Sequence, residues 1–220
     1  MTTLALDTST ARLVVGLVDE ISDAALPAPV VRAARVLDDA RRHNELLVPT
    51  IAEVLAEAGL TYADIDRVVC GCGPGPFTGL RVGMATAAAT ADALGVPLRG
   101  VCSLDAVARS PRLSGRVALV VSDARRREAY WATYDAAGER TAGPEVCAPA
   151  DLPVPEGLAV VSAPDTLAEK LPEAGDAELV ELYPEPAGLV TAPEVEFRPI
   201  YLRRPDAVAP TVRVSPALRP

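Results

Sequence analysis

The residues of this 220-residue chain that most suggest chemistry form a glycine-rich stretch, GCGPGPFTGLRVG, from Gly71 to Gly83. Glycines between a strand and a helix are typical of loops that bind phosphate through backbone N–H groups. Pro74 and Pro76 have no N–H to donate. A P-loop also requires lysine and serine or threonine after its last glycine, and here Gly79 is followed by leucine and arginine. The pattern therefore argues against a phosphate cradle, although a free helix N-terminus near Phe77 retains some potential to bind an anion.

The same stretch fits close packing better. Small residues recur every four positions at Gly79, Gly83, Ala87, Ala91 and Gly95. On a helix this spacing places them on one face, where a second backbone can approach closely. The neighbour can be the chain's own sheet or a helix of another subunit, and the spacing alone leaves both interpretations open.

Asp7, in the segment LALDTST, is a second candidate because it stands at the end of an expected strand. In actin-like ATPases an aspartate at such a position helps to hold magnesium and phosphate. Those loops place a glycine soon after the aspartate, whereas Thr8 and Ser9 follow here and favour an ordinary turn cap. The single histidine, His43, can form neither a two-histidine metal site nor a serine–histidine–aspartate triad. We predict no metal site and no catalytic residue from these patterns.

Three consecutive arginines, Arg125, Arg126 and Arg127, lie in an expected turn between two strands. They could contact RNA phosphates or a protein partner, or they could form a solvated hairpin turn. The net charge of −9 and the pI near 4.7 oppose a free-standing nucleic-acid binder. An independent RNA-binding protein is therefore kept only as a further alternative.

The remaining composition indicates a cytoplasmic protein. Cys70, Cys72, Cys102 and Cys147 form no CxxC pair, and we expect buried thiols in a reducing compartment. The N-terminus shows no signal peptide, and the longest run of low charge is rich in alanine and threonine and too short for a membrane span.

The hydrophobic pattern predicts strands at 4–10, 12–20, 29–39, 66–73 and 96–102, with helices at 43–60 and 76–94. Three strands before the first helix is the order of the ribonuclease-H-like fold of actin-like ATPases and sugar kinases. We therefore predict an α/β fold with mixed sheets flanked by helices.

The rest of the chain is expected to form a smaller unit. We predict a short helix at 103–110, strands at 115–124, 127–138, 157–163 and 177–183, and a helix at 184–194. Most of the 21 prolines follow residue 140, which favours loops, and no internal repeat is visible. The expected organisation is an N-terminal lobe at 1–102, a reduced C-terminal lobe at 103–205, and an extended, flexible tail at 206–220.

Five blocks in order carry a resemblance to a known family: LALDTST, RRHNELLVPTI, the glycine stretch continuing to GVPLRGVCSLDA, DARRREAYWATY and PIYLRRPDA. With these blocks the chain closely resembles the bacterial TsaB (YeaZ) family. The stretch from about 143 to 198 matches loosely.

The resemblance implies a role in forming threonylcarbamoyladenosine beside the tRNA anticodon. It implies a non-catalytic scaffold that pairs with and activates the catalytic subunit TsaD, that is joined by the ATPase TsaE, and that forms a homodimer when TsaD is absent. No cofactor is expected on the chain alone, because partner subunits handle ATP and the metal ion. Ser103 and Val107 stand where catalytic relatives carry metal-binding histidines. The alternative is an enzyme, either an actin-like ATPase or a glycoprotease-like protein.

The resemblance also implies that the two N-terminal helices form the interface with TsaD. The expected interface residues are His43, Leu47, Ile51, Val54, Pro76, Phe77, Gly79, Leu80, Gly83 and Ala87. Asp7 and Thr8 would be a vestigial phosphate site, and Arg125 to Arg127 a contact for RNA or a partner.

Overall fold

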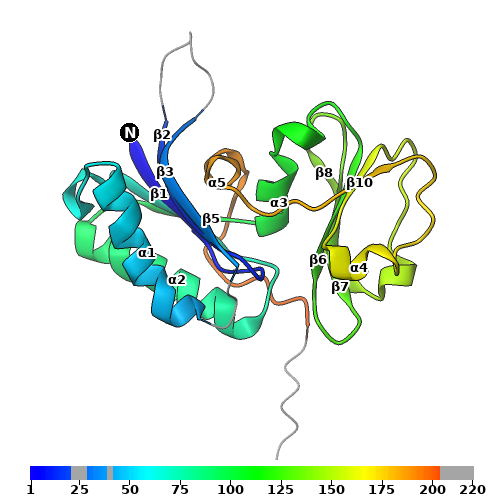
Figure 1. Cartoon of the computed structure of the whole chain (residues 1–220), viewed down its shortest axis with the longest axis horizontal. Helices are drawn as coiled ribbons and strands as arrows, with labels where there is room; N and C mark the ends of the chain where they lie inside the picture. Colours follow the sequence, from blue (N-terminus) through cyan, green and yellow to red (C-terminus); the bar gives the residue numbers. More distant parts are fainter. Residues whose placement is uncertain (21–28, 39–41, 204–220) are drawn as a thin grey trace, which may run out of the picture.

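The structure is a computed structural model that describes residues 1–20, 29–38 and 42–203. It contains two mixed β-sheets side by side, with helices on both faces of the first and between the two (Figure 1). Among the described helices, none has the length and apolar character needed to cross a lipid bilayer.

The first sheet has the strand order β11-β5-β4-β1-β2-β3. Its strands are β1 (Thr2–Asp7), β2 (Leu13–Asp19), β3 (Val30–Leu37), β4 (Arg67–Gly71), β5 (Leu98–Val101) and β11 (Glu194–Val195). β1, β2 and β3 form an antiparallel meander, while β4 lies parallel to β1 and β5 lies parallel to β4. This arrangement confirms the predicted ribonuclease-H-like fold.

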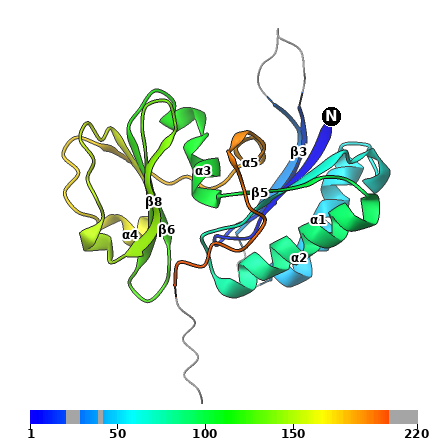
Figure 2. The same ribbon diagram turned by 180° about the vertical axis from the view of Figure 1, so that it is seen from behind.

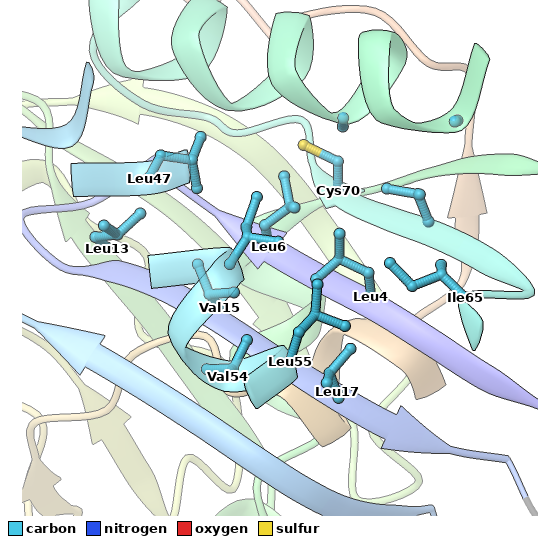
Figure 3. Packing of buried hydrophobic residues seen from close by; sticks show 14 of the residues in the cluster. Leu4, Leu6, Leu13, Val15, Leu17, Leu47, Val54, Leu55, Ile65 and Cys70 are labelled. Atoms are coloured by element: carbon cyan, nitrogen blue, oxygen red, sulfur yellow. The ribbon is translucent and has the colours of Figure 1, made fainter. Parts of the chain in front are cut away.

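Two long helices, α1 (His43–Glu57) and α2 (Phe77–Leu94), cover one face of this sheet (Figures 1 and 2). Leu47, Val54 and Leu55 of α1 pack against the core that includes Leu4 and Leu17 of the strands (Figure 3). α1 is shorter than the helix predicted at 43–60, because Gly59 has a φ of 67° in the left-handed region and cannot continue it. α2 differs slightly from the expectation, since the proline at 76 caps the helix and the first helical residue is the phenylalanine that follows.

The other face of the first sheet is covered by α5 (Pro186–Thr191), which contacts β1 and β2. α3 (Ser103–Ala108) packs on α5 and on β6 of the second sheet, so these two short helices lie between the sheets (Figure 1). Two 3-10 turns lie in the connections of this part of the chain: Tyr62–Asp64 between α1 and β4, and Pro111–Leu113 between α3 and β6.

The second sheet repeats the topology of the first. Its strands are β6 (Ala118–Asp123), β7 (Ala129–Tyr134), β8 (Arg140–Cys147), β9 (Val160–Ser162) and β10 (Glu178–Val180), in the order β10-β9-β6-β7-β8. β6, β7 and β8 are an antiparallel meander, β9 is parallel to β6, and β10 is parallel to β9. β6 to β10 therefore correspond to β1 to β5, an internal structural repeat that the sequence analysis did not detect.

The second lobe keeps all five strands of the repeat, although β9 and β10 are short, and it is reduced mainly in its helices. A 3-10 turn at Pro149–Asp151 stands where α1 stands in the first lobe, and α4 (Asp165–Ala168) stands in the place of α2. β8 was missed because Gly143 and Pro144 interrupt its sequence pattern. Proline is tolerated there because β8 is an edge strand.

The C-terminal segment corrects the expected lobe boundary at residues 103–205. β11 pairs with β5, and the Ile200 N–H donates to the Cys72 carbonyl at 2.8 Å. Together with α5, these contacts return the chain to the first lobe after β10, so the second lobe is an insertion within the first. The predicted tail at 206–220 lies outside the described residues.

Candidate functional site

The Asp7 carboxylate is fully buried at the end of β1 and is held by groups of its own chain. Its Oδ1 accepts hydrogen bonds from the Ser9 N–H at 2.8 Å and the Ser9 hydroxyl at 2.7 Å. Its Oδ2 accepts a short hydrogen bond from the Ser103 hydroxyl, and Ser103 is the first residue of α3. The predicted turn cap is confirmed, and Ser103 joins it as a partner that the sequence analysis considered only as a missing metal ligand.

Two glycines of the opening stretch leave room for this buried turn. A Cβ atom on Gly71 would lie 1.7 Å from the Asp7 Oδ2 atom, and one on Gly75 would lie 2.2 Å from the Ser9 carbonyl oxygen. Neither approach is possible for a residue with a side chain, so glycine is required at both positions. The Gly73 N–H, in the same loop, donates to the Ser103 hydroxyl at 3.2 Å.

Gly83 packs against the same turn. A Cβ on Gly83 would lie 2.2 Å from the Thr8 Oγ1 atom, and this hydroxyl donates to the Gly79 carbonyl at 2.7 Å. The face of α2 that carries Gly83 is therefore filled by the β1–β2 turn of the same chain. The interpretation of Gly83 as room for a partner helix is corrected, because the close neighbour is intramolecular.

A narrow crevice lies beside Asp7, between the two lobes. On the side of the first lobe it is lined by Ser9, which follows β1, and by Ser103, which begins α3. On the side of the second lobe it is lined by Ser122 of β6 and by Tyr183, which follows β10. Its volume is about 10 Å³, which is room for about one water molecule. Ligand pockets usually measure some hundreds of Å³, so this crevice does not admit a nucleotide in the conformation described.

The Arg12 guanidinium packs on Tyr183, one of the residues that line the crevice. Its central carbon lies 3.9 Å from the centre of the Tyr183 ring. Burial, followed by the hydrogen bond to Glu181, raises the pKa of the Tyr183 hydroxyl to about 12. Tyr183 is therefore a neutral phenol at physiological pH and acts as a packing and hydrogen-bonding group.

No group of three or more histidine, cysteine, aspartate and glutamate residues that could hold a metal ion occurs within residues 1–20, 29–38 and 42–203. Burial raises the pKa of the Cys72 thiol to about 11 and that of Cys102 to about 12, and it also raises the pKa of Cys70. These three cysteines are buried as predicted, and Cys147 is half-buried. Thiols with such raised pKa values are poor nucleophiles and poor metal ligands at neutral pH.

Most of the expected interface residues are used by the core of the chain itself. Those with at most 1 % of their surface exposed are Leu47, Ile51, Val54, Leu80 and Ala87. The apolar stripe that predicted an interface is the stripe that packs on the sheet, because one face of an amphipathic helix meets the core. These side chains are not available to a partner of the folded chain. His43 begins α1, and its side chain lies outside the described residues.

An outer helical face remains available on α1 and α2, which lie side by side (Figures 1 and 2). We define it by the exposed residues Val48 and Ala52 of α1 and Ala85 and Ala89 of α2. Val48 is 54 % exposed, which is high for an aliphatic side chain. Of the other expected interface residues, Pro76 and Gly79 are half-buried near the start of α2.

Phe77 belongs to an exposed aromatic cluster at the start of α2, defined by Phe77, Arg81 and Tyr201. The two rings stack with centres 5.3 Å apart, and the Arg81 guanidinium carbon lies 3.8 Å from the Phe77 ring centre. Tyr201 is distant in sequence and reaches this place because the C-terminal segment returns to the first lobe. Phe77 was predicted from the sequence as an interface residue, whereas no sequence signal indicated Tyr201 as its stacking partner.

The three arginines form an exposed turn between β6 and β7, called the arginine turn below. Arg125, Arg126 and Arg127 all have positive φ, at 61°, 52° and 66°. The Arg125 N–H donates to the Asp123 Oδ1 atom at 2.7 Å, as the Ser9 N–H does to Asp7 in the first lobe. The arginine turn is therefore the second-lobe counterpart of the buried β1–β2 turn.

Comparisons with known proteins identify sequences and structures that are similar to this chain. A family model described as "TsaD: tRNA N6-adenosine threonylcarbamoyltransferase" matches residues 37–184. An uncharacterized protein of Mycobacterium tuberculosis is 49% identical over 212 residues, which is 94% of this chain and 93% of the relative. The tRNA threonylcarbamoyladenosine biosynthesis protein TsaB of Escherichia coli is 34% identical over 96 residues, 43% of this chain and 42% of the relative.

A solved structure described as YeaZ from Pseudomonas aeruginosa superposes with a TM-score of 0.72 at 29% identity. The superposition covers 91% of this chain and 99% of that one, so the similarity includes both lobes.

Proposed function

Because this chain belongs to the TsaB (YeaZ) family, we propose that it is the non-catalytic scaffold of a bacterial tRNA threonylcarbamoyl transferase complex. Its role in tRNA modification is supported by the match to the threonylcarbamoyltransferase family model and by the similarity to the Escherichia coli TsaB protein. In this role the chain binds and activates the catalytic subunit TsaD and performs no transfer itself.

The observation that carries the non-catalytic part of the proposal is the closed Asp7 site. The carboxylate that could have met magnesium or phosphate is buried and occupied by the hydroxyl groups of Ser9 and Ser103. The crevice beside it has room for about one water molecule. A protein with this arrangement contributes to the reaction by binding other subunits, which handle ATP and the metal ion.

The outer helical face is the proposed surface for TsaD, and for a second copy of this chain when TsaD is absent. Its exposed side chains are small or aliphatic, and α1 and α2 give them a rigid support. Small residues let a pair of helices from a partner approach closely and bury continuous apolar surface. The ATPase TsaE is proposed to join the assembled pair.

Copurification with TsaD tests this surface. Ala85→Arg places a long charged side chain on the outer helical face without entering the core, because Ala85 is exposed. We expect it to abolish pairing and the stimulation of threonylcarbamoyl transfer while the melting temperature stays unchanged. Ala136→Arg, at an exposed position in the turn between β7 and β8, is the matched control and should pair normally. Normal pairing of Ala85→Arg would exclude this face as the interface.

Calorimetry of the isolated chain with magnesium-ATP tests the non-catalytic assignment. We expect no heat of binding, because the Asp7 carboxylate is occupied by groups of its own chain and the crevice beside it has room for about one water molecule. Micromolar binding that is lost in Asp7→Ala would favour an actin-like ATPase instead.

A further inference from the structure

The aromatic cluster is a stack of flat groups that lies outside the core. Phe77 is 51 % exposed and Tyr201 is 43 % exposed. The Arg81 guanidinium lies over the Phe77 ring, and its Nε donates to the Tyr201 hydroxyl at 3.3 Å. Aromatic rings and guanidinium planes that are held in this way are the groups on which unpaired RNA bases stack.

The arginine turn lies close to this cluster because Arg203 ties the two together. Arg203 forms an ion pair with Glu128 at 2.9 Å and donates to the Ala124 carbonyl at 3.1 Å, at the base of the turn. Tyr201 precedes Arg203 by two residues, so their Cα atoms are separated by at most about 7 Å. In both views the described chain ends between the start of α2 and the turn that joins β6 to β7 (Figures 1 and 2).

The charge of this surface is opposite in sign to that of the whole chain. The start of α2, the arginine turn with its flanking residues, and the segment from 196 to 203 carry six arginines: Arg81, Arg125, Arg126, Arg127, Arg198 and Arg203. The carboxylates on the same segments are Asp123, Glu128 and Glu196. Two of them are paired, Glu128 with Arg203 and Glu196 with Arg198. The surface therefore has an excess of positive charge that suits a phosphate backbone.

We propose that the aromatic cluster and the arginine turn together bind unpaired nucleotides of an RNA loop. Bases stack on the exposed planes of Tyr201 and Arg81, and the arginine turn contacts the flanking phosphates. The inference rests on the proposed function, since the RNA is the tRNA that the complex modifies. A protein partner would use the rings as anchors without needing the excess of arginine, so the charge favours RNA.

Fluorescence anisotropy tests the proposal with a labelled RNA hairpin that has a seven-nucleotide loop. The intact chain is measured alone and copurified with TsaD, with an RNA duplex of equal length as the comparison. We expect Tyr201→Ala to weaken loop binding about 10-fold, the loss of one base-stacking contact, and to leave duplex binding unchanged. Tyr201→Phe retains the ring and should retain the affinity. Arg125→Gln and Arg127→Gln should each lower the salt dependence of log K by about 1.

Matched controls carry a tyrosine and an arginine away from the proposed RNA surface. Tyr62 is the control for Tyr201, because it precedes β4, whereas the aromatic cluster lies after the other end of that strand. Arg112 is the control for Arg125, because it precedes β6, whereas the arginine turn follows that strand. We expect Tyr62→Ala and Arg112→Gln to bind the RNA loop like the unchanged chain.

Two results would overturn the inference. One is loop affinity that Tyr201→Ala and Arg125→Gln leave unchanged. The other is loss of pairing with TsaD in Tyr201→Ala while RNA affinity is retained, which would make the ring a protein anchor. Failure of the proposed function has a different signature, namely transfer activity of TsaD that does not depend on this chain, whatever RNA binding shows.

Discussion

Both lobes begin with a strand, a turn and a second strand, but they differ in how far that turn is exposed to solvent. In the first lobe Asp7 ends β1, and the first two residues of its turn, Thr8 and Ser9, are buried beneath α2 and the glycine loop. In the second lobe Asp123 ends β6 with the same hydrogen bond to the residue two positions later, and its turn is exposed and basic. The difference follows from the helices, because the second lobe has no long helix to cover its turn. One fold unit, used twice, therefore supplies a rigid core in one lobe and an accessible surface in the other.

The largest expected effect comes from filling the space around the buried turn. Gly71→Ala should lower the free energy of unfolding by about 3 kcal/mol, because its Cβ would overlap the Asp7 carboxylate. Gly115→Ala is the control, since nothing lies within 4 Å of a Cβ there and the cost is limited to about 1 kcal/mol for its positive φ. Urea unfolding measures both. Equal losses would show that the tight packing around Asp7 is unimportant.

The two equivalent aspartates should differ in their contribution to stability. Asp7→Ala leaves the Ser9 N–H and the Ser103 hydroxyl buried without an acceptor, and we expect a loss of about 2 to 4 kcal/mol. Asp123→Ala should cost less than about 1 kcal/mol, because water can replace the carboxylate at an exposed turn. Comparable urea midpoints for the two variants would contradict the difference between the buried and the exposed turn.

A second buried carboxylate, Asp105 of α3, contacts the second lobe and should make the stability of the chain depend on pH. It accepts a hydrogen bond from the Tyr134 hydroxyl at 2.8 Å, and Arg140 lies 3.6 Å away. Burial raises its pKa, a shift that Glu139 also favours and that Tyr134, Arg140 and Arg109 oppose. Because the folded state then holds the proton more tightly than the unfolded state, this contribution to stability is present at low pH and is lost as pH rises through the folded pKa.

Asp105→Asn should remove that contribution and keep the acceptor for Tyr134. We therefore expect the stability of the unchanged chain, relative to Asp105→Asn, to increase as pH falls from 7 toward 4. Urea unfolding at several pH values measures the trend, and a difference that does not vary with pH would exclude the raised pKa.

The smallest effect is expected at the arginine turn. Arg127→Gly relieves a positive φ and should raise the free energy of unfolding by up to about 1 kcal/mol. Ala136→Gly, in the turn after β7, gains no such relief and should lower it by about 0.5 kcal/mol. Thermal unfolding of both variants shows whether each substitution raises or lowers stability. A destabilised Arg127→Gly would show that the arginine side chain stabilises the turn.

The sequence predicted the first lobe well because its signals are local. The apolar periodicity predicted the two long helices of this lobe, and the structure confirms both, with α1 three residues and α2 one residue shorter than expected. The order of strands and helices in the first hundred residues was sufficient to identify the fold class. The exposed position of the arginine turn is consistent with its place between two predicted strands.

The sequence could not predict which surface would cover each stripe. Leu47 and Gly83 lie on faces that fit a partner helix and the chain's own sheet equally well, and periodicity does not distinguish them. The closure of Asp7 by Ser103 joins residues 96 positions apart, and the stacking of Tyr201 on Phe77 also depends on tertiary structure. The repeat was missed because strands of three residues and the loss of long helices leave too little pattern to compare.

The return of the C-terminal segment to the first sheet has a consequence for synthesis on the ribosome. β11 pairs with β5, and α5 covers β1 and β2, so the first lobe needs residues that are translated after the whole second lobe. The N-terminal lobe cannot complete its core as it emerges from the exit tunnel, as an independent N-terminal domain would. Contacts of such long sequence separation slow folding, and they also make the two lobes a single cooperative unit.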